Sequence, residues 1–109
     1  MTTQCTGHIR LDGRPGVRKE TALEELARLL CEQEILAFLY GEELHWNGCD
    51  EDSLETVEGC VHFFSCTGWN DYISLYWQDG ETGSAGMRAW KKGRSCGDMY
   101  QACKSNLSK

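Results

Sequence analysis

A helical spacing of apolar residues dominates the first half of the chain. Six of them fall on one stripe at i, i+3, i+4 and i+7 spacing: Leu23, Leu26, Ala27, Leu30, Ala37 and Phe38. Thr21 and Glu24 form a capping box before this stripe, and Gly41 stands where a helix commonly ends. The pattern therefore predicts a long helix over residues 22–40.

The end of this stretch also fits a strand. Residues 35–40 are apolar on all sides, whereas a surface helix needs only one apolar face. In this alternative the helix ends near Gln33, and a strand runs from Ile35 to Tyr40. The sequence leaves both interpretations open.

Further along the chain, the apolar positions change to a period of two, which is typical of strands. Three such runs, at 60–66, 72–78 and 84–90, are separated by the turn-forming segments Thr-Gly-Trp-Asn-Asp and Asp-Gly-Glu-Thr-Gly. They predict an antiparallel three-stranded meander. His8–Leu11 and Leu44–Trp46 are weaker candidates for short additional edge strands.

The register of the last two strands depends on the loop between them, because a slip of one residue exchanges the two faces of a strand. A two-residue turn at Asp79-Gly80 would place Ile73 opposite Gly86 and leave the apolar face unmatched. We therefore prefer a loop over residues 79–83. It pairs Trp77 with Ala85, Leu75 with Met87, and Ile73 with Ala89.

The C-terminal end returns to a helical pattern. Ser95 and Asp98 form a weak capping box, which predicts a short helix over about 96–105. The expected fold is thus α+β: an antiparallel meander sheet of three to five strands, one long N-terminal helix packed against it, and a short C-terminal helix. A chain of 109 residues with 40% hydrophobic residues and one proline fits one globular domain over 1–109.

The cysteines and the hydropathy indicate the expected compartment. The seven cysteines form no Cys-x-x-Cys pair, and their number is odd, so a complete disulfide framework is not expected. No apolar run approaches the roughly 18 residues of a membrane span, and no secretory signal follows Met1. We expect a cytoplasmic or nuclear protein in a reducing compartment, without membrane contact.

Charge is distributed unevenly along the chain, whose net charge is −6. Residues 1–55 carry 12 acidic and 5 basic side chains, and residues 56–109 carry 5 acidic and 6 basic side chains. The stretch from Glu42 to Glu58 has no Lys or Arg. We interpret it as an acidic loop that is solvated or steers a basic partner, with Asp50, Glu51 and Asp52 as candidate contacts.

The preferred register gathers large side chains on one sheet face. Its candidate partner-binding residues are Phe64, Tyr72, Tyr76, Arg88 and Trp90. Such a surface, if exposed, is typical of a macromolecular interface. It would instead become a second core layer if a helix or the N-terminal segment covered it.

Motifs for catalysis or for a cofactor are absent from the sequence. It has no phosphate-binding glycine loop, no Gly-x-Ser-x-Gly and no His-Glu-x-x-His. Cys60, His62 and Cys66 are weak candidates for part of a zinc site, but their spacing matches no established zinc knuckle. We expect no catalytic residues and no cofactor.

We therefore expect a non-enzymatic protein-binding module that occludes a surface of another protein. In general character the chain is similar to small inhibitors and to immunity or virus-encoded host-interference proteins. A small zinc-stabilised domain and single-stranded nucleic-acid binding on the aromatic face are the alternatives, although the net charge of −6 disfavours nucleic acid. A homodimer is also compatible with an exposed aromatic face.

Overall fold

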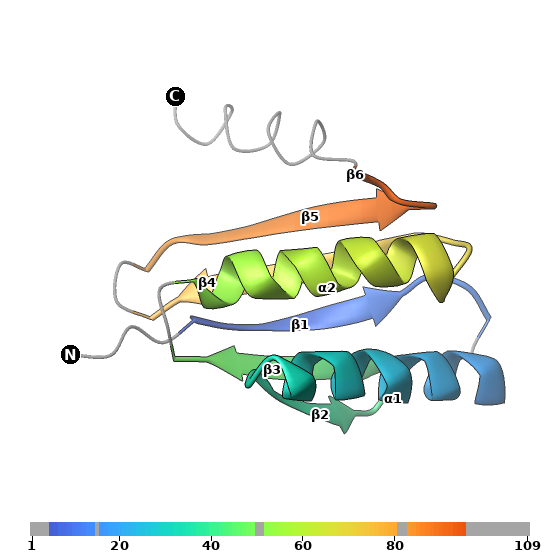
Figure 1. The fold of residues 1–109 in the computed structure, drawn as a ribbon, viewed down its shortest axis with the longest axis horizontal. Coiled ribbons are helices and arrows are strands. Elements are labelled where there is room, and N and C mark those ends of the chain that lie inside the picture. The colour runs from blue at the N-terminus through green and yellow to red at the C-terminus, as the bar shows by residue number, and fades with distance from the viewer. Residues whose placement is uncertain (1–4, 15, 50–51, 81–82, 96–109) are drawn as a thin grey trace.

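A computed structural model describes residues 5–14, 16–49, 52–80 and 83–95 (Figure 1). These residues form an antiparallel sheet and two helices, which confirms the α+β class. In chain order the elements are β1 (Cys5–Leu11), α1 (Val17–Glu32), β2 (Leu36–Tyr40), β3 (Glu43–Gly48), α2 (Ser53–Thr67), β4 (Ile73–Asp79), β5 (Ala85–Lys91) and β6 (Arg94–Ser95).

The sheet has the strand order β2-β3-β1-β4-β5-β6, and every neighbouring pair is antiparallel. Helix α1 connects β1 to β2, while β3 lies between those two strands. Helix α2 connects β3 to β4 in the same manner, with β1 between them. This interleaved arrangement is a split β-α-β motif, extended at one side by β5 and β6.

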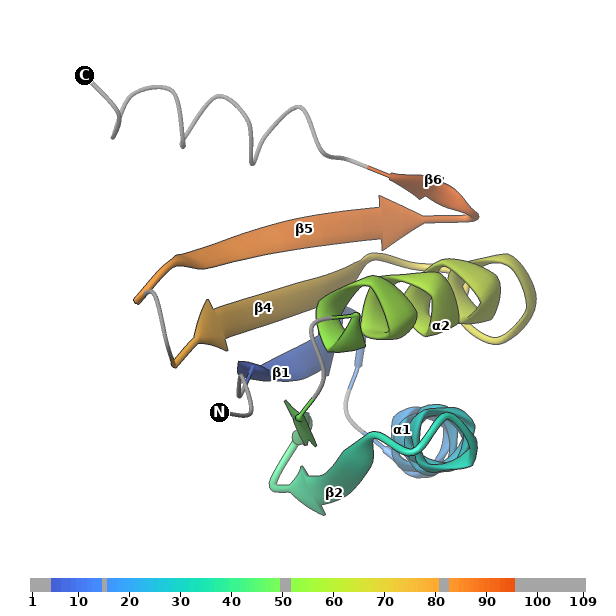
Figure 2. The ribbon, with the colours of Figure 1, turned by 60° about the vertical axis from the view of Figure 1, so that its left-hand side comes forward.

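Both helices pack on the same face of the sheet, as Figures 1 and 2 show together. The strands send alternate apolar side chains to that face, including Ile9, Leu44 and Leu75, none of which is exposed. Leu26 of α1 and Val61 of α2 close the same core from the helix side. The opposite face, which we call the open face, is covered by neither helix.

The prediction of one helix over 22–40 is wrong, and the alternative with a strand is confirmed. Helix α1 begins at Val17, so Thr21 lies within it and does not cap it. At its other end Glu34 adopts a left-handed conformation with φ 64°. The amide of Glu34 donates to the Cys31 carbonyl, and the amide of Ile35 donates to the Leu30 carbonyl. These bonds close the helix as a Schellman motif and release the chain into β2.

The predicted strand at 60–66 is wrong, because this segment belongs to α2. Its buried residues Val57, Val61 and Phe64 are four and three positions apart, which is the spacing of one helix face. Phe63 sits beside them in sequence but is 57% exposed. The acidic stretch is likewise not a loop over its described residues: it contains β3, the N-cap residue Asp52 and the first turns of α2.

The two later strands of the predicted meander are confirmed as β4 and β5. The connection between them is longer than a two-residue turn, but the predicted loop over 79–83 is wrong because Asp79 belongs to β4, and the register differs by one residue. Asp79 and Ser84 close the hairpin through a backbone hydrogen bond of 2.7 Å, so four residues separate them. Ile73 consequently pairs with Trp90 and Leu75 with Arg88, which turns Arg88 and Trp90 toward the helices.

The two weaker strand predictions are confirmed as strands, although neither lies at an edge. The segment His8–Leu11 is part of β1, which lies between β3 and β4, and Leu44–Trp46 is part of β3. The predicted helix over 96–105 lies outside the described residues. None of the helices within the described ranges has the length and apolar character required to cross a membrane.

Candidate functional site

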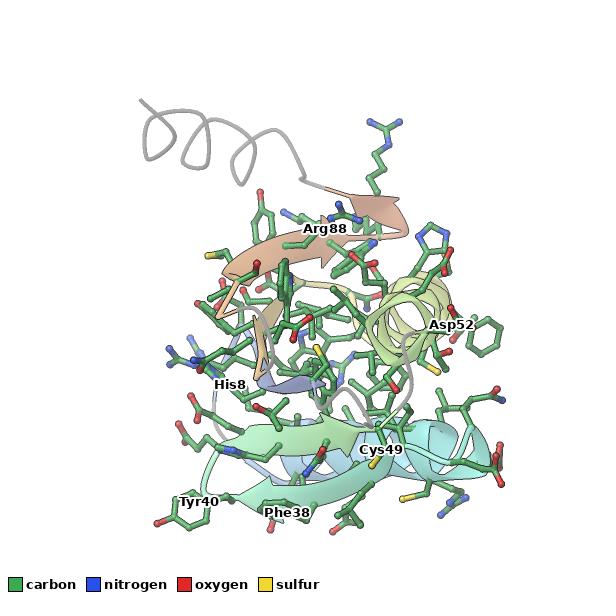
Figure 3. All side chains as sticks on the ribbon, turned by 90° about the vertical axis from the view of Figure 1, so that its left-hand side faces the viewer. His8, Phe38, Tyr40, Cys49, Asp52 and Arg88 are labelled. Atoms are coloured by element: carbon green, nitrogen blue, oxygen red, sulfur yellow. The ribbon has the colours of Figure 1, made fainter. Side chains whose placement is uncertain are left out.

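A row of rings crosses the open face at right angles to the strands. The register places Phe38 of β2 opposite His45 of β3, His45 opposite His8 of β1, and His8 opposite Tyr76 of β4. We call these four residues the ring row. Figure 3 shows Phe38 projecting from β2 and His8 on the side of the sheet away from α2.

Neighbouring rings of the row are in contact. His8 and Tyr76 stack with their centroids 4.4 Å apart and an interplanar angle of 18°. His45 lies 5.7 Å from both His8 and Phe38, measured between centroids. Two nearly parallel rings at 4.4 Å must turn their faces toward each other. The rings of His8 and Tyr76 therefore stand upright on the sheet and present their edges outward.

Glu43 of β3 balances the charged groups beside the ring row. Its carboxylate lies 3.5 Å from Nε of Arg10, 3.4 Å from Nε2 of His45 and 4.0 Å from Nε2 of His8. Tyr40 of β2 completes this neighbourhood by placing its ring edge-on to His45, at 5.6 Å between centroids. Because Arg10 is matched by Glu43, this part of the open face carries little net charge while the histidines are neutral.

A groove of about 500 Å³ runs beside the ring row. Its lining includes His8, Phe38, His45 and Tyr76 together with Asn47. The Asn47 Oδ1 atom is buried and accepts no hydrogen bond from any described residue. Buried acceptors in folded proteins nearly always have a donor, so this oxygen is an exception among the described residues.

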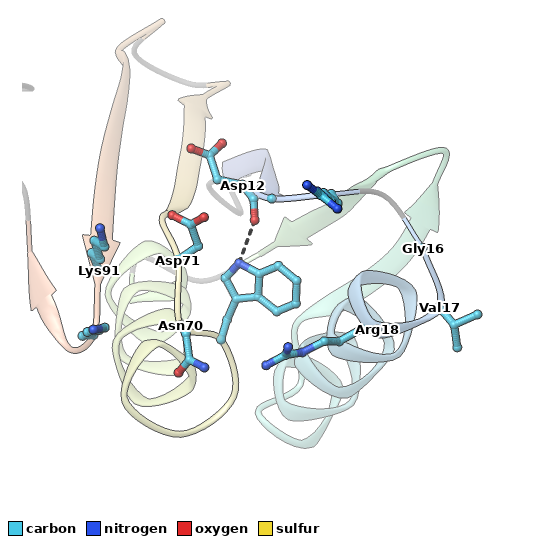
Figure 4. A pocket seen from close by; sticks show the side chains of 11 residues that line it. Asp12, Gly16, Val17, Arg18, Asn70, Asp71 and Lys91 are labelled. Carbon is cyan, nitrogen blue, oxygen red and sulfur yellow. Dashed lines mark hydrogen bonds between the residues drawn. The ribbon is translucent and has the colours of Figure 1, made fainter.

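A second cavity, of about 840 Å³, lies at the end of the sheet where α1 begins (Figure 4). Four cations line it, at Arg14, Arg18, Lys91 and Lys92, with two carboxylates, Asp12 and Asp71. Trp69 forms its floor: its Nε1 donates to the Asp12 carbonyl at 2.9 Å, and the Arg18 guanidinium lies 5.9 Å from its ring. We call this the cationic cavity. Its lining has a formal charge of +2, in a chain of −6.

The sequence-predicted partner-binding residues do not form one surface. Phe64 and Trp90 are buried in the core, and Arg88 pairs with Glu58 on the helix side of the sheet, which corrects the prediction that the three face a partner. Tyr76 belongs to the ring row. Tyr72 lies at the end of the open face, with Lys91 Nζ 4.9 Å from its ring centroid.

The acidic candidates lie elsewhere. Asp52 is the exposed N-cap residue of α2 and makes no side-chain capping hydrogen bond. Asp50 and Glu51 lie outside the described residues. The structure therefore places the one described acidic candidate on the helix side, remote from the ring row that Tyr76 helps to form (Figure 3).

The geometry of α2 separates Cys60 from the other two weak zinc candidates. At 100° per residue, Cys60 and His62 point to nearly opposite sides of the helix, whereas His62 and Cys66, four residues apart, lie on the same side. Within the described ranges no group of three or more His, Cys, Asp and Glu side chains is placed to hold a metal. Burial raises the pKa of the Cys60 thiol, and the Glu32 carboxylate raises it further, which disfavours the reactive thiolate.

Sequence reasoning missed Phe38, His45 and His8. They lie on β2, β3 and β1, none of which belongs to the predicted three-stranded meander, and no local motif connects them. The available signal was the alternative strand over 35–40, together with His8 and Arg10 at strand period on one side of β1. Only the pairing of β1 with both β3 and β4 brings the rings together.

The ion pair of Glu58 and Arg88 allows a prediction about pH. Arg88 Nη1 lies 2.8 Å from Glu58 Oε2. Burial raises the pKa of the Glu58 carboxyl more than Arg88 lowers it, and Glu55 raises it further. A raised folded-state pKa means that ionised Glu58 opposes folding above that pKa, and that this cost is relieved as the pH falls through it.

We expect Arg88→Met to lower the free energy of unfolding by about 1 kcal/mol at neutral pH, after allowance for solvent screening of the partly exposed guanidinium. The loss should shrink toward pH ~4.5, because the uncompensated Glu58 then becomes protonated. Urea denaturation at both pH values measures it. The double variant Glu58→Gln/Arg88→Met is the control and should lack this pH dependence; a loss of equal size at both pH values would contradict the assignment.

Comparison of the chain with protein-family models, with curated protein sequences and with solved structures found no match.

Proposed function

We propose that this protein is a non-enzymatic binding module that recognises another protein through the open face of its sheet. The observation that carries the proposal is a sheet face that neither described helix covers, on which a row of contacting rings continues onto an edge strand of exposed apolar residues. Leu36, Phe38 and Tyr40 of β2 are 63%, 52% and 72% exposed. Contiguous apolar and aromatic surface of this kind, with a polar surround, is characteristic of protein interfaces.

The groove supports the same proposal. The groove is lined by aromatic rings together with the polar residue Asn47, which suits a partner that combines apolar and polar contacts. Inhibition or interference by occluding a partner's surface is compatible with such a face, since occlusion requires contact area and no catalytic group. We therefore include occlusion of the partner's surface in the proposed function.

Single-stranded nucleic acid is the second candidate, and the cationic cavity beside Tyr72 and Lys91 favours it. It is the weaker candidate for two reasons. His8 and Tyr76 already stack on each other, so each offers at most one free ring face to a base. The cations of the cavity also lie at the end of the sheet, whereas Arg10 beside the ring row is matched by Glu43.

A pair of matched variants tests the proposal. Phe38→Ser removes a 52% exposed ring from the open face, and Phe63→Ser removes a 57% exposed ring from α2. We expect Phe38→Ser to weaken retention of a bound protein by at least about tenfold, because truncated aromatic anchors commonly cost that much or more. Phe63→Ser should leave retention unchanged. The measurement is affinity capture from cells of the source organism, quantified by mass spectrometry with and without nuclease.

The proposal fails if no protein distinguishes the wild type from Phe38→Ser, or if Phe63→Ser removes the same proteins. Retention that disappears on nuclease treatment would favour the nucleic-acid candidate instead. Circular dichroism of each variant shows whether a loss reflects unfolding, which is not expected because both side chains are more than half exposed.

A further inference from the structure

Strand β2 is an apolar edge without the usual protection. It lies at the end of the strand order and pairs only with β3 among the described residues. Its five residues, Leu36–Tyr40, contain no charge and no proline. Outside the helices and ladders, the described backbone hydrogen bonds involve Ile35 but none of residues 36–40. Natural proteins normally protect such an edge with lysine, proline or a bulge, because its free N–H and C=O groups can pair with another strand.

The two ends of β2 are acidic. Glu32 and Glu34 precede the strand, and Glu42 follows it. The next residue, Glu43, is already paired with Arg10. The chain contains no Lys or Arg between Arg28 and Arg88, so no basic residue follows Glu34 or Glu42 in this part of the sequence. The edge therefore combines an uncharged centre with negative charge at both ends.

We propose that β2 is the docking edge for an extended segment of a partner protein, and that this segment has an apolar core flanked on both sides by Lys or Arg. The segment would add as a further strand beside β2 and place alternate side chains next to Leu36, Phe38 and Tyr40 of the open face. Because acidic residues stand at both ends, the charge match holds for either strand direction. This inference rests on the proposed function and specifies the partner of the same surface.

A second copy of the chain is a poor occupant. Antiparallel pairing of β2 with itself, centred on Phe38, would place Glu34 next to Glu42 of the other copy at both ends. Parallel pairing would place Glu34 next to Glu34 and Glu42 next to Glu42. Like charges across paired strands are destabilising, so the flanks that attract a basic segment also oppose self-association.

Two labelled peptides probe the edge directly. Both have an alternating valine and threonine core as long as β2; one carries lysines at both ends and the other carries glutamates. Fluorescence anisotropy at low salt measures their dissociation constants. We expect the wild type to bind the lysine-flanked peptide at least about tenfold more tightly than the glutamate-flanked one, and Glu34→Lys/Glu42→Lys to reverse this preference.

The matched control is Glu24→Lys/Glu25→Lys, which changes the net charge equally at exposed positions of α1. It should keep the wild-type preference. Lysine also suits position 34 no less than glutamate does, since both carry a Cβ at the left-handed φ of 64°.

Three outcomes would overturn the inference: no binding of the lysine-flanked peptide, an equal change in preference in both double variants, or self-association of the wild type in sedimentation experiments. The last outcome would make a second copy the occupant. Failure here is distinguishable from failure of the proposed function. If Phe38→Ser loses its partner while the peptide preference is insensitive to Glu34 and Glu42, the open face binds a protein but not by strand addition.

Discussion

Gly7→Ala is expected to lower the free energy of unfolding by about 3 kcal/mol or more, although it adds only a methyl group. Gly7 lies in β1, opposite Trp46 of β3 and Trp77 of β4. A Cβ at this position would overlap the carbonyl oxygen of Tyr76 and approach Cζ2 of the Trp46 indole to 2.8 Å. One of these obstacles is backbone in the neighbouring strand, so the strain cannot be relieved by a rotamer change alone.

Gly59→Ala is the matched control and should have the opposite sign. Gly59 is an exposed residue within α2, and a Cβ there would meet nothing within 4 Å. Alanine in a helix interior is favoured over glycine by about 1 kcal/mol, so the variant should gain stability. Urea denaturation of both variants measures the difference. A Gly7→Ala protein as stable as the wild type would contradict the close packing of Trp46 against β1.

Val61→Asp is expected to cost more than about 4 kcal/mol and to leave the domain largely unfolded. Val61 has no exposed surface and belongs to the hydrophobic core, so a carboxylate would be buried among apolar side chains. Phe63→Asp, two residues away, should change stability by less than about 1 kcal/mol because Phe63 is exposed.

Comparing Val61→Asp with Phe63→Asp shows whether residues 60–66 form a helix or a strand. In a strand, Val61 and Phe63 would share one face and both substitutions would be damaging. In α2 they lie about 200° apart around the axis, and only Val61 reaches the core. Thermal unfolding followed by circular dichroism would show the contrast. Equal and severe losses from both variants would restore the strand interpretation.

The fold class could be predicted from the sequence because the chain mixes two clear periods. Strands β4 and β5 alternate visibly, and the stripe of Leu23, Leu26 and Leu30 marks α1. The end of α1 could not be predicted with the same certainty, because it depends on Glu34 in a left-handed conformation, which glutamate rarely adopts. Gly41, the residue expected to end the helix, lies instead in the turn between β2 and β3, where it has a positive φ.

The site was harder to predict, because one residue of loop length decides which face a side chain occupies. The expected loop over 79–83 placed Arg88 and Trp90 beside Tyr76, whereas the hairpin closed by Asp79 and Ser84 places them on the helix side. The strand prediction for residues 60–66 was wrong for a different reason. Val61 and Phe64 fit a helix and Val61 and Phe63 fit a strand, so a short apolar run satisfied both periods.

The ring row has no linear counterpart in the chain. Its four members come from four strands, and His8 and Tyr76, which stack at 4.4 Å, are separated by most of the sequence. An antibody raised against any single peptide of the chain would therefore not recognise this surface as a unit. A conformational antibody that binds the ring row would report directly whether β2, β3, β1 and β4 are all paired in the sheet.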